Sequence, residues 1–159
     1  GIECVFYWPV EWVSLAFDNG YTPLSIDEAQ AIAEEFEIGS HTVTHRHLTR
    51  IPIGDAKWEI YESKIRLMKM FDQPITKFCP PRGYTTAELT KFTLEHYDSQ
   101  RLTVGPGLVH VHPDSGANGN VPWRMVADET AVTELWMHSW ELDKYNLWDE
   151  LEEYLKEVS

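Results

Sequence analysis

The pattern of apolar and polar residues predicts short strands that alternate with helices. Apolar runs typical of buried strands lie at about 3–8, 36–39, 75–78 and 133–137, with two further candidates at 102–104 and 108–111. The longer segments between these runs repeat their apolar residues at helical spacing. Because strands joined by helices form parallel sheets, this order predicts an α/β fold.

Capping residues set the expected starts of the helices. Ser25 and Glu28 have the spacing of a capping box, and Thr85 and Glu88 repeat it before a later helix. Asn146 is expected to cap the last helix. The helix expected at 55–71 has a predicted apolar face that contains Trp58, Tyr61, Ile65 and Met68, widened by Ile60, Leu67 and Phe71.

Composition limits the classes of fold and partner. The chain has 159 residues, 43% of them hydrophobic, which predicts a single domain over 1–159 with a core of its own. A net charge of −13 argues against a nucleic-acid partner, because few positive side chains are present to neutralise phosphates. We find no apolar run long enough to span a membrane, and the chain opens on a strand and not on a signal peptide. Cys4 and Cys79 decide neither a disulfide nor the compartment.

Residues 37–45 carry the strongest chemical signal in the chain. His41 and His45 are four residues apart and follow a short strand that ends at Gly39. If the backbone turns helical there, both imidazoles lie on one face and can bind one cation. Neutral imidazole is a common metal ligand, although two polar residues at a helix start would show the same spacing. The HExxH pattern of zinc proteases is absent, since no Glu follows His41.

Three polar clusters each follow a predicted strand, at 40–47, 80–84 and 138–142. The carboxyl ends of parallel strands converge on one rim, so we expect the three clusters to meet there. Alone, His138 has the features of a structural histidine, and its place after a strand makes it a candidate catalyst. His110 and His112 form another pair, but amidohydrolases place such a pair on an early strand, which makes this a weaker metal candidate.

These segments resemble the polysaccharide deacetylases with a NodB homology domain, carbohydrate esterase family 4. The matching runs are EIGSHTVTHRHL at 37–48, ITKFCPPRGY at 75–84 and LWMHSWEL at 135–142, in the order and spacing of that family. The resemblance covers nearly the whole chain. It implies a distorted, incomplete (β/α) barrel, in which the family's first strand and helix are missing from this chain.

The resemblance also implies an activity and a cofactor. Members of the family hydrolyse N- or O-acetyl groups on a carbohydrate with a divalent metal, usually zinc. His41 and His45 match the two histidine ligands of that metal, and His138 matches the general acid. Ser40 and Thr44 are expected to orient the ligands by hydrogen bonds.

The resemblance assigns the remaining site residues to the substrate. A backbone N–H near Arg82 matches an oxyanion donor, and Trp136 and Met137 match an apolar pocket for the acetyl methyl. Trp123 and Trp140 are candidate sugar platforms, with core packing as the alternative. The full set of expected substrate contacts is Pro81, Arg82, Gly83, Tyr84, Trp123, Trp136, Met137 and Trp140.

Two features of the family are not found in this sequence. Its Phe-Asp-Asp-Gly motif supplies the catalytic base and an aspartate ligand. The run at 17–20 is similar, but Asp18 precedes His41 by too few residues for a strand–helix–strand unit, which takes roughly 30 or more. Cys79 stands where the family has an arginine, and Arg82 is a candidate replacement. We expect an upstream segment or a second copy to complete the barrel, or the chain to fold without that part.

The leading hypothesis is a metal-dependent hydrolase that removes acetyl groups from carbohydrate. The alternatives are a pseudoenzyme that binds carbohydrate or metal, and a related hydrolase of small linear amides. Loss of the aspartates weakens metal binding and forfeits general-base assistance of roughly 10²–10⁴-fold. Family members are often secreted or attached to the cell envelope, but the sequence leaves the compartment open.

Overall fold

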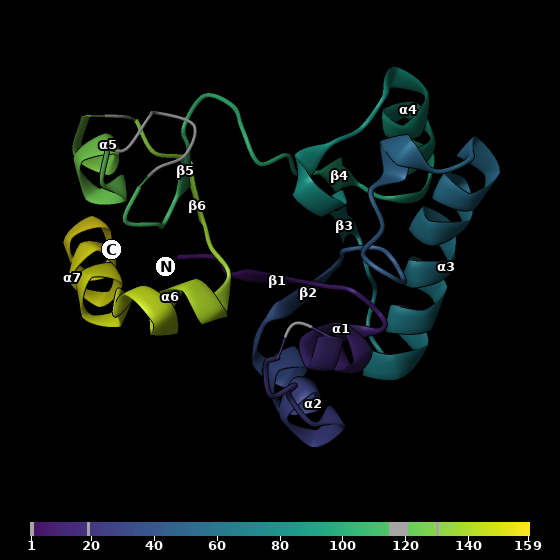
Figure 1. Cartoon of the computed structure of the whole chain (residues 1–159), viewed down its shortest axis with the longest axis horizontal. Coiled ribbons are helices and arrows are strands. Elements are labelled where there is room, and N and C mark those ends of the chain that lie inside the picture. The colour runs from purple at the N-terminus through teal and green to yellow at the C-terminus, as the bar shows by residue number, and fades with distance from the viewer. Residues whose placement is uncertain (1, 19, 115–120, 130) are drawn as a thin grey trace. The chain divides into compact units, whose positions relative to one another are not determined.

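The computed structural model describes residues 2–18, 20–114, 121–129 and 131–159, and the chain divides into two compact units (Figure 1). We call residues Glu3–Leu102 the N-terminal unit and Thr103–Ser159 the C-terminal unit. Every strand pair in both units is parallel, which confirms the predicted α/β class. The assignment of the whole chain to one domain stays a prediction.

The N-terminal unit is built on a parallel sheet in the order β1-β2-β3-β4. Its strands are β1 (Val5–Trp8), β2 (Glu37–Ser40), β3 (Lys77–Phe78) and β4 (Ser99–Gln100). Its helices are α1 (Trp12–Asp18), α2 (Ile26–Glu35), α3 (Ile53–Phe71) and α4 (Ala87–His96), with short 3-10 turns η1 (Leu48–Arg50) and η2 (Pro81–Gly83). Neither α1 nor β4 was predicted, and the expected strand at 102–104 is not formed.

One of the two predicted capping boxes is confirmed. Glu28 N–H donates to Ser25 Oγ at 3.3 Å, and the Glu28 carboxylate accepts the Ser25 N–H at 2.8 Å. The second is wrong by one residue, because Thr86 accepts the Leu89 N–H at 3.2 Å and begins α4. Glu88 instead pairs with Lys57 Nζ at 2.7 Å.

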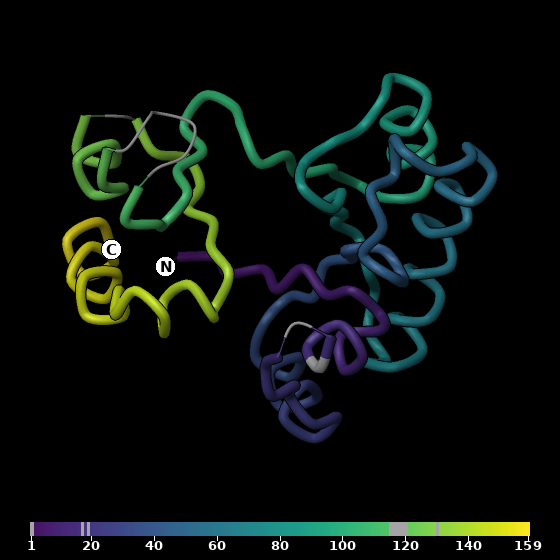
Figure 2. Tube along the Cα trace, in the orientation of Figure 1, coloured from purple at the N-terminus to yellow at the C-terminus, as the bar shows by residue number. Residues whose placement is uncertain are grey.

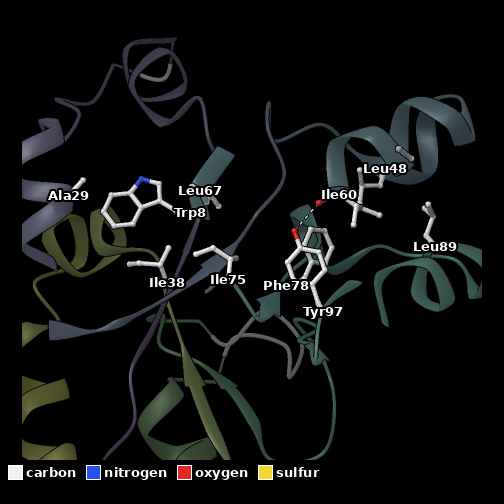
Figure 3. Close-up of a cluster of buried hydrophobic side chains, with 11 residues drawn as sticks. Trp8, Ala29, Ile38, Leu48, Ile60, Leu67, Ile75, Phe78, Leu89 and Tyr97 are labelled. Atoms are coloured by element: carbon white, nitrogen blue, oxygen red, sulfur yellow. Dashed lines mark hydrogen bonds between the residues drawn. The ribbon is translucent and has the colours of Figure 1, made fainter. Parts of the chain in front are cut away.

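The predicted apolar face of α3 is wrong. Ile60 and Leu67, expected only to widen it, are fully buried in the core of the unit (Figure 3). The central stripe faces out instead, with Trp58 48% exposed. The remaining buried positions of α3 are Ala56, Glu59 and Ser63. Two of these are polar, so a count of apolar residues could not assign the buried side.

The core of the N-terminal unit packs these helices against the sheet. Its larger members include Trp8, Ile38, Leu48, Ile60, Phe78 and Tyr97. The Tyr97 hydroxyl donates to the Ile60 carbonyl at 2.8 Å, the dashed line in Figure 3. This bond satisfies a polar group that would otherwise be costly to bury.

The C-terminal unit has its own small sheet and core. Figure 2 traces the path of its chain. Strand β5 (Leu108–His110) pairs with β6 (Glu134–Trp136), and the helices are α5 (Trp123–Glu129), α6 (Ser139–Tyr145) and α7 (Trp148–Val158). The expected role of Asn146 is wrong. It ends α6 in the left-handed region, with φ of 53°, and Leu147 precedes α7. Asparagine tolerates that conformation, which explains its place at a helix end.

Two further expectations concern membranes and disulfides. None of the helices within the described ranges combines the length and the apolar character needed to cross a bilayer. The exposed Cys4 and the buried Cys79 are both free thiols. A disulfide between them, which the sequence left open, is therefore not formed.

Candidate functional site

A left-handed turn, and not a helix, brings the predicted metal ligands together. Strand β2 ends at Ser40, and Thr42 and His45 then have φ angles of 73° and 57°. The His45 N–H donates to Thr42 Oγ1 at 3.0 Å and closes the turn. A positive φ is uncommon for a β-branched residue, so the loop holds its shape against local strain. The helical condition attached to the His41–His45 prediction was wrong.

The two imidazoles are oriented toward each other. His41 Nε2 and His45 Nε2 lie 3.1 Å apart, and His41 Nδ1 lies 2.6 Å from the Cys79 carbonyl oxygen. A carbonyl only accepts, so Nδ1 carries the hydrogen and a neutral His41 directs its Nε2 lone pair toward His45. Metal-binding histidines commonly donate their second N–H in this way. Two nitrogens on one zinc ion, at about 2.0–2.1 Å each, lie roughly 3.3 Å apart. The pair therefore fits a divalent cation.

A buried carboxylate on α3 supports the loop from below. Glu59 is almost fully buried and accepts the backbone N–H groups of Val43 and Thr44, both at 2.9 Å. It also accepts the Thr44 hydroxyl. Glu59 was assigned no role from the sequence. The available signal was a glutamate on a helix face with Ala56 and Ile60.

A second buried network joins β2 to α3. Ser40 Oγ lies 2.7 Å from Ser63 Oγ, and Ser63 donates to the Ile60 carbonyl at 2.9 Å. Burial raises the pKa of Tyr97 to about 12, although hydrogen bonds with Ser40 and Ser63 act to lower it. Ser40 and Thr44 were expected to orient the histidines directly. Their hydroxyls instead bond to residues of α3, and the Cys79 carbonyl orients His41.

The cluster at 80–84 lies beside the histidine loop. Pro81 is buried, and Arg82 and Gly83 follow with φ angles of 61° and 73°. Tyr84 is 57% exposed and stacks on His47, with ring centroids 4.8 Å apart. Gly83 N–H donates to the Pro80 carbonyl at 2.9 Å, and the expected oxyanion donor near Arg82 stays a prediction. The first two predicted clusters therefore meet within the N-terminal unit.

A guanidinium lies next to Cys79, but it belongs to Arg101. Arg101 Nη1 is 3.7 Å from Cys79 Sγ, and its guanidinium carbon is 5.8 Å from the centre of the Tyr7 ring. The Arg82 side chain is exposed in the preceding loop. Sequence reasoning considered only Arg82 as a replacement for the family arginine and missed Arg101, which follows β4, a strand that was not predicted.

The third cluster gathers around a carboxylate in the C-terminal unit. Glu141 Oε2 lies 2.9 Å from His110 Nε2 and 3.0 Å from His138 Nδ1. The same oxygen accepts the His138 backbone N–H at 2.9 Å. Burial alone would raise the pKa of Glu141, but the hydrogen bonds from the two histidines hold it well below its usual range. Glu141 is therefore a carboxylate that stabilises positive charge or a cation beside it.

The aromatic residues of this cluster have different environments. Trp136 stacks on His110 with centroids 3.7 Å apart, and Trp140 stacks on His138 at 5.8 Å. Met137 is half-buried against the core of the unit. Trp123 is only 1% exposed, so its expected role as a sugar platform is wrong and the core-packing alternative is correct. Its buried ring packs against Tyr154.

The histidine pair lacks a third ligand in the part of the chain that the structure describes. There, no His, Cys, Asp or Glu offers a donor atom within 4.8 Å of both His41 and His45. Asp18 ends helix α1 and does not follow a strand, which agrees with its rejection as the family's aspartate. Three-ligand geometry is found instead at His110, His138 and Glu141.

Comparisons with solved structures place the fold. A polysaccharide deacetylase from Bacillus cereus aligns with a TM-score of 0.56 at 23% identity, covering 67% of this chain and 32% of that one. A CE4 family pseudoenzyme from Bacillus anthracis aligns at 0.68 and 15% identity, covering 99% of this chain and 52% of that one. A deacetylase from Streptococcus pyogenes, solved in complex with acetate, aligns at 0.53 and 16% identity, covering 76% and 50%. The chain thus spans between a third and a half of their lengths.

These alignments confirm the predicted incomplete (β/α) barrel of the NodB type. A search of curated proteins finds no match to the chain. Residues 26–97, which include α2, the histidine loop, α3 and the 80–84 turn, match the family model described as polysaccharide deacetylase. Residues 26–97 thus match the polysaccharide deacetylase family, and the fold of the chain is similar to that of a CE4 family structure.

Proposed function

We propose that this chain is a zinc-dependent hydrolase that removes acetyl groups from carbohydrate. The observation that carries the proposal is the His41–His45 geometry, with Nε2 atoms 3.1 Å apart and the His41 ring fixed by the Cys79 carbonyl. The match of residues 26–97 to the polysaccharide deacetylase family model supports the class of reaction and substrate in this proposal.

The histidine pair is the part of the chain that would hold the cation. When bound, a divalent cation supplies Lewis-acid polarisation of the acetyl carbonyl and favours ionisation of the attacking water. His41 and His45 provide two neutral nitrogen donors, and the Glu59-supported loop keeps them from moving apart. A third donor and a catalytic base would come from a segment or a copy beyond the described residues.

His138 is assigned the proton transfer. Water oxygen bonds to the acetyl carbon as water gives a proton to the catalytic base. The carbon–nitrogen bond breaks and the leaving nitrogen takes a proton from His138, which yields an amine and acetic acid that ionises to acetate. Glu141 holds His138 Nδ1 at 3.0 Å and leaves the other ring nitrogen as the donor.

Trp136 and Met137 are proposed to receive the methyl group, and Trp140 a sugar ring. The Arg82 N–H is proposed to stabilise the developing oxyanion, with Pro81, Gly83 and Tyr84 around it.

A second candidate function is binding of metal or carbohydrate without turnover. It is favoured by the sequence, in which the family's Phe-Asp-Asp-Gly motif is not found at the expected spacing before His41. The likeness to a CE4 family pseudoenzyme from Bacillus anthracis points the same way. A base and a charged ligand are the two contributions that such a chain would lack.

Acetate release from zinc-loaded chain with N-acetylglucosamine oligomers tests the proposal. We expect release that depends on zinc and is lost in His41→Ala with His45→Ala. Zinc binding without acetate release, both alone and with an added Phe-Asp-Asp-Gly segment, would support the second candidate and overturn the first. Release from a small linear amide but not from the oligomers would instead indicate a hydrolase of small amides.

A further inference from the structure

The C-terminal unit holds a complete set of donors for a metal ion. His110 Nε2, His138 Nδ1 and a Glu141 oxygen all lie within 4.8 Å of one another. Two imidazoles and one carboxylate are also the protein ligands of one common class of zinc site. We propose that His110, His138 and Glu141 bind a zinc ion, as a second set of ligands with no residue in common with the His41–His45 pair.

The three donors are already ordered. Trp136 lies opposite His110 in the β5–β6 register and stacks on its ring at 3.7 Å with an interplanar angle of 3°. Glu141 is 4% exposed, and the His138 backbone N–H holds its Oε2 at 2.9 Å. Little side-chain freedom remains to be lost when a cation binds, which favours binding.

The distances suit replacement of two protons by one cation. Each histidine lies about as far from Glu141 Oε2 as two ligands of one zinc ion lie from each other, 2.9 and 3.0 Å here against roughly 3.3 Å. Without a hydrogen on these two nitrogens, all three donor atoms could bind one cation placed between them. The His138 side chain is 51% exposed, so water can complete the coordination from that side. The net charge of −13 also favours cations near the chain.

Occupation of this site would change what His138 can do. A histidine whose Nδ1 binds a metal cannot also be an imidazolium that donates a proton. Zinc bound at His110, His138 and Glu141 should therefore inhibit acetate release. This consequence rests on the proposed function, whereas the existence of the site does not.

Zinc titration of the metal-free full-length chain by calorimetry tests the site directly. We expect the variant His41→Ala with His45→Ala to keep one zinc equivalent. Adding His110→Gln to it should weaken that binding by at least about tenfold, since even outer partners of metal ligands are worth about 10–100-fold. Glu141→Gln should have a similar effect while still accepting the His138 N–H.

His112→Gln is the matched control. It lies two residues from His110, but its Nδ1 is 2.8 Å from the Asp114 carbonyl oxygen and accepts the Asp114 N–H. It should leave zinc binding unchanged. The proposal is overturned if the double variant binds no zinc, or if His110→Gln weakens binding no more than His112→Gln does. Circular dichroism of each variant reports whether it folds. Because zinc stoichiometry is the measured quantity, a chain that releases no acetate can still confirm the site.

Discussion

The two histidine clusters use a buried carboxylate in different ways. In the N-terminal unit, Glu59 accepts backbone N–H groups of the loop and so fixes the path of the chain between the two rings. In the C-terminal unit, one oxygen of Glu141 contacts both imidazoles and is itself a donor atom. The same residue types thus give a supported loop with two ligands in one unit and a three-donor set in the other.

The two clusters also differ in backbone conformation, which is strained in the N-terminal unit and ordinary in the C-terminal unit. Thr42 and His45 both have left-handed backbone angles, so contacts from another part of the unit must stabilise the strained histidine loop. His138 has an ordinary extended conformation, with φ of −106°, and only Met137 separates it from the end of β6. A strained loop needs its carboxylate for support, whereas an unstrained strand end leaves its carboxylate free to face the rings.

Removing the histidine pair should have the largest effect on activity. Lewis-acid stabilisation is worth several kcal/mol, so His41→Ala with His45→Ala should lower acetate release by roughly 10³-fold or more. Zinc analysis should show the loss of one equivalent and the retention of the other. His47→Ala, a change in the same loop, serves as the control for metal content and should lose neither. Equal zinc content in the double variant and the unaltered chain would contradict the assignment of the pair.

Replacing each of the two carboxylates, Glu59 and Glu141, with alanine separates their roles. Glu59→Ala leaves the N–H of the buried Val43 and that of the half-buried Thr44 without their carboxylate acceptor. A buried unpaired N–H costs about 1–3 kcal/mol, so the free energy of unfolding should fall by at least roughly that amount. Glu141→Ala leaves only one backbone N–H without its acceptor, that of the more exposed His138. The free energy of unfolding should therefore fall by less. Zinc binding at the C-terminal cluster should show the reverse order. Urea denaturation measures the free energy of unfolding, and calorimetry measures zinc binding. If the same variant has the larger effect in both measurements, the two carboxylates do not have different roles.

Much of the architecture followed from patterns that are local in the sequence. The Ser25–Glu28 capping box, the strands and the parallel sheet depend on neighbours a few residues apart. The buried side of α3 did not follow, because Glu59 and Ser63 are polar and are buried only through bonds to distant segments. The left-handed backbone of Thr42 could not be predicted either, because threonine disfavours a positive φ and adopts it here only through the surrounding structure.

The candidate site likewise has a part that could be predicted from the sequence and a part that could not. His41, His45 and the 80–84 turn were predicted to come together, and the resemblance to the family made that prediction specific. The His110–Glu141 contact was missed because 31 positions separate the two residues and no periodic signal links them. Its only signal was a second histidine pair, which was judged by its position in other folds. Trp123 shows the converse, since tryptophan suits both a sugar platform and a core, and burial decided between them.

Tyr97 allows the buried network between β2 and α3 to be tested by pH. Its pKa is raised to about 12 by burial, so its contribution to stability is fully present below the unfolded value of about 10. That contribution is lost as the pH rises from about 10 to 12, at roughly 1.4 kcal/mol per pH unit. Tyr97→Phe should remove this part of the alkaline loss of stability in urea denaturation. An identical slope in both proteins would show that the phenol titrates as it does in the unfolded chain.

The smallest expected effect concerns the strain itself. Asparagine adopts left-handed φ angles at lower cost than threonine, and its side-chain oxygen can still accept the His45 N–H. Thr42→Asn should therefore raise the free energy of unfolding by about 0.5–1 kcal/mol, less than the full relief of strain because a buried methyl is lost. The reciprocal change is available in the C-terminal unit, where Asn146 has φ of 53°. Asn146→Thr should lower the free energy of unfolding by a similar amount in urea denaturation. If Thr42→Asn destabilises the chain as much as Asn146→Thr, the left-handed turn is not strained, and the contrast between the two clusters rests on their carboxylates alone.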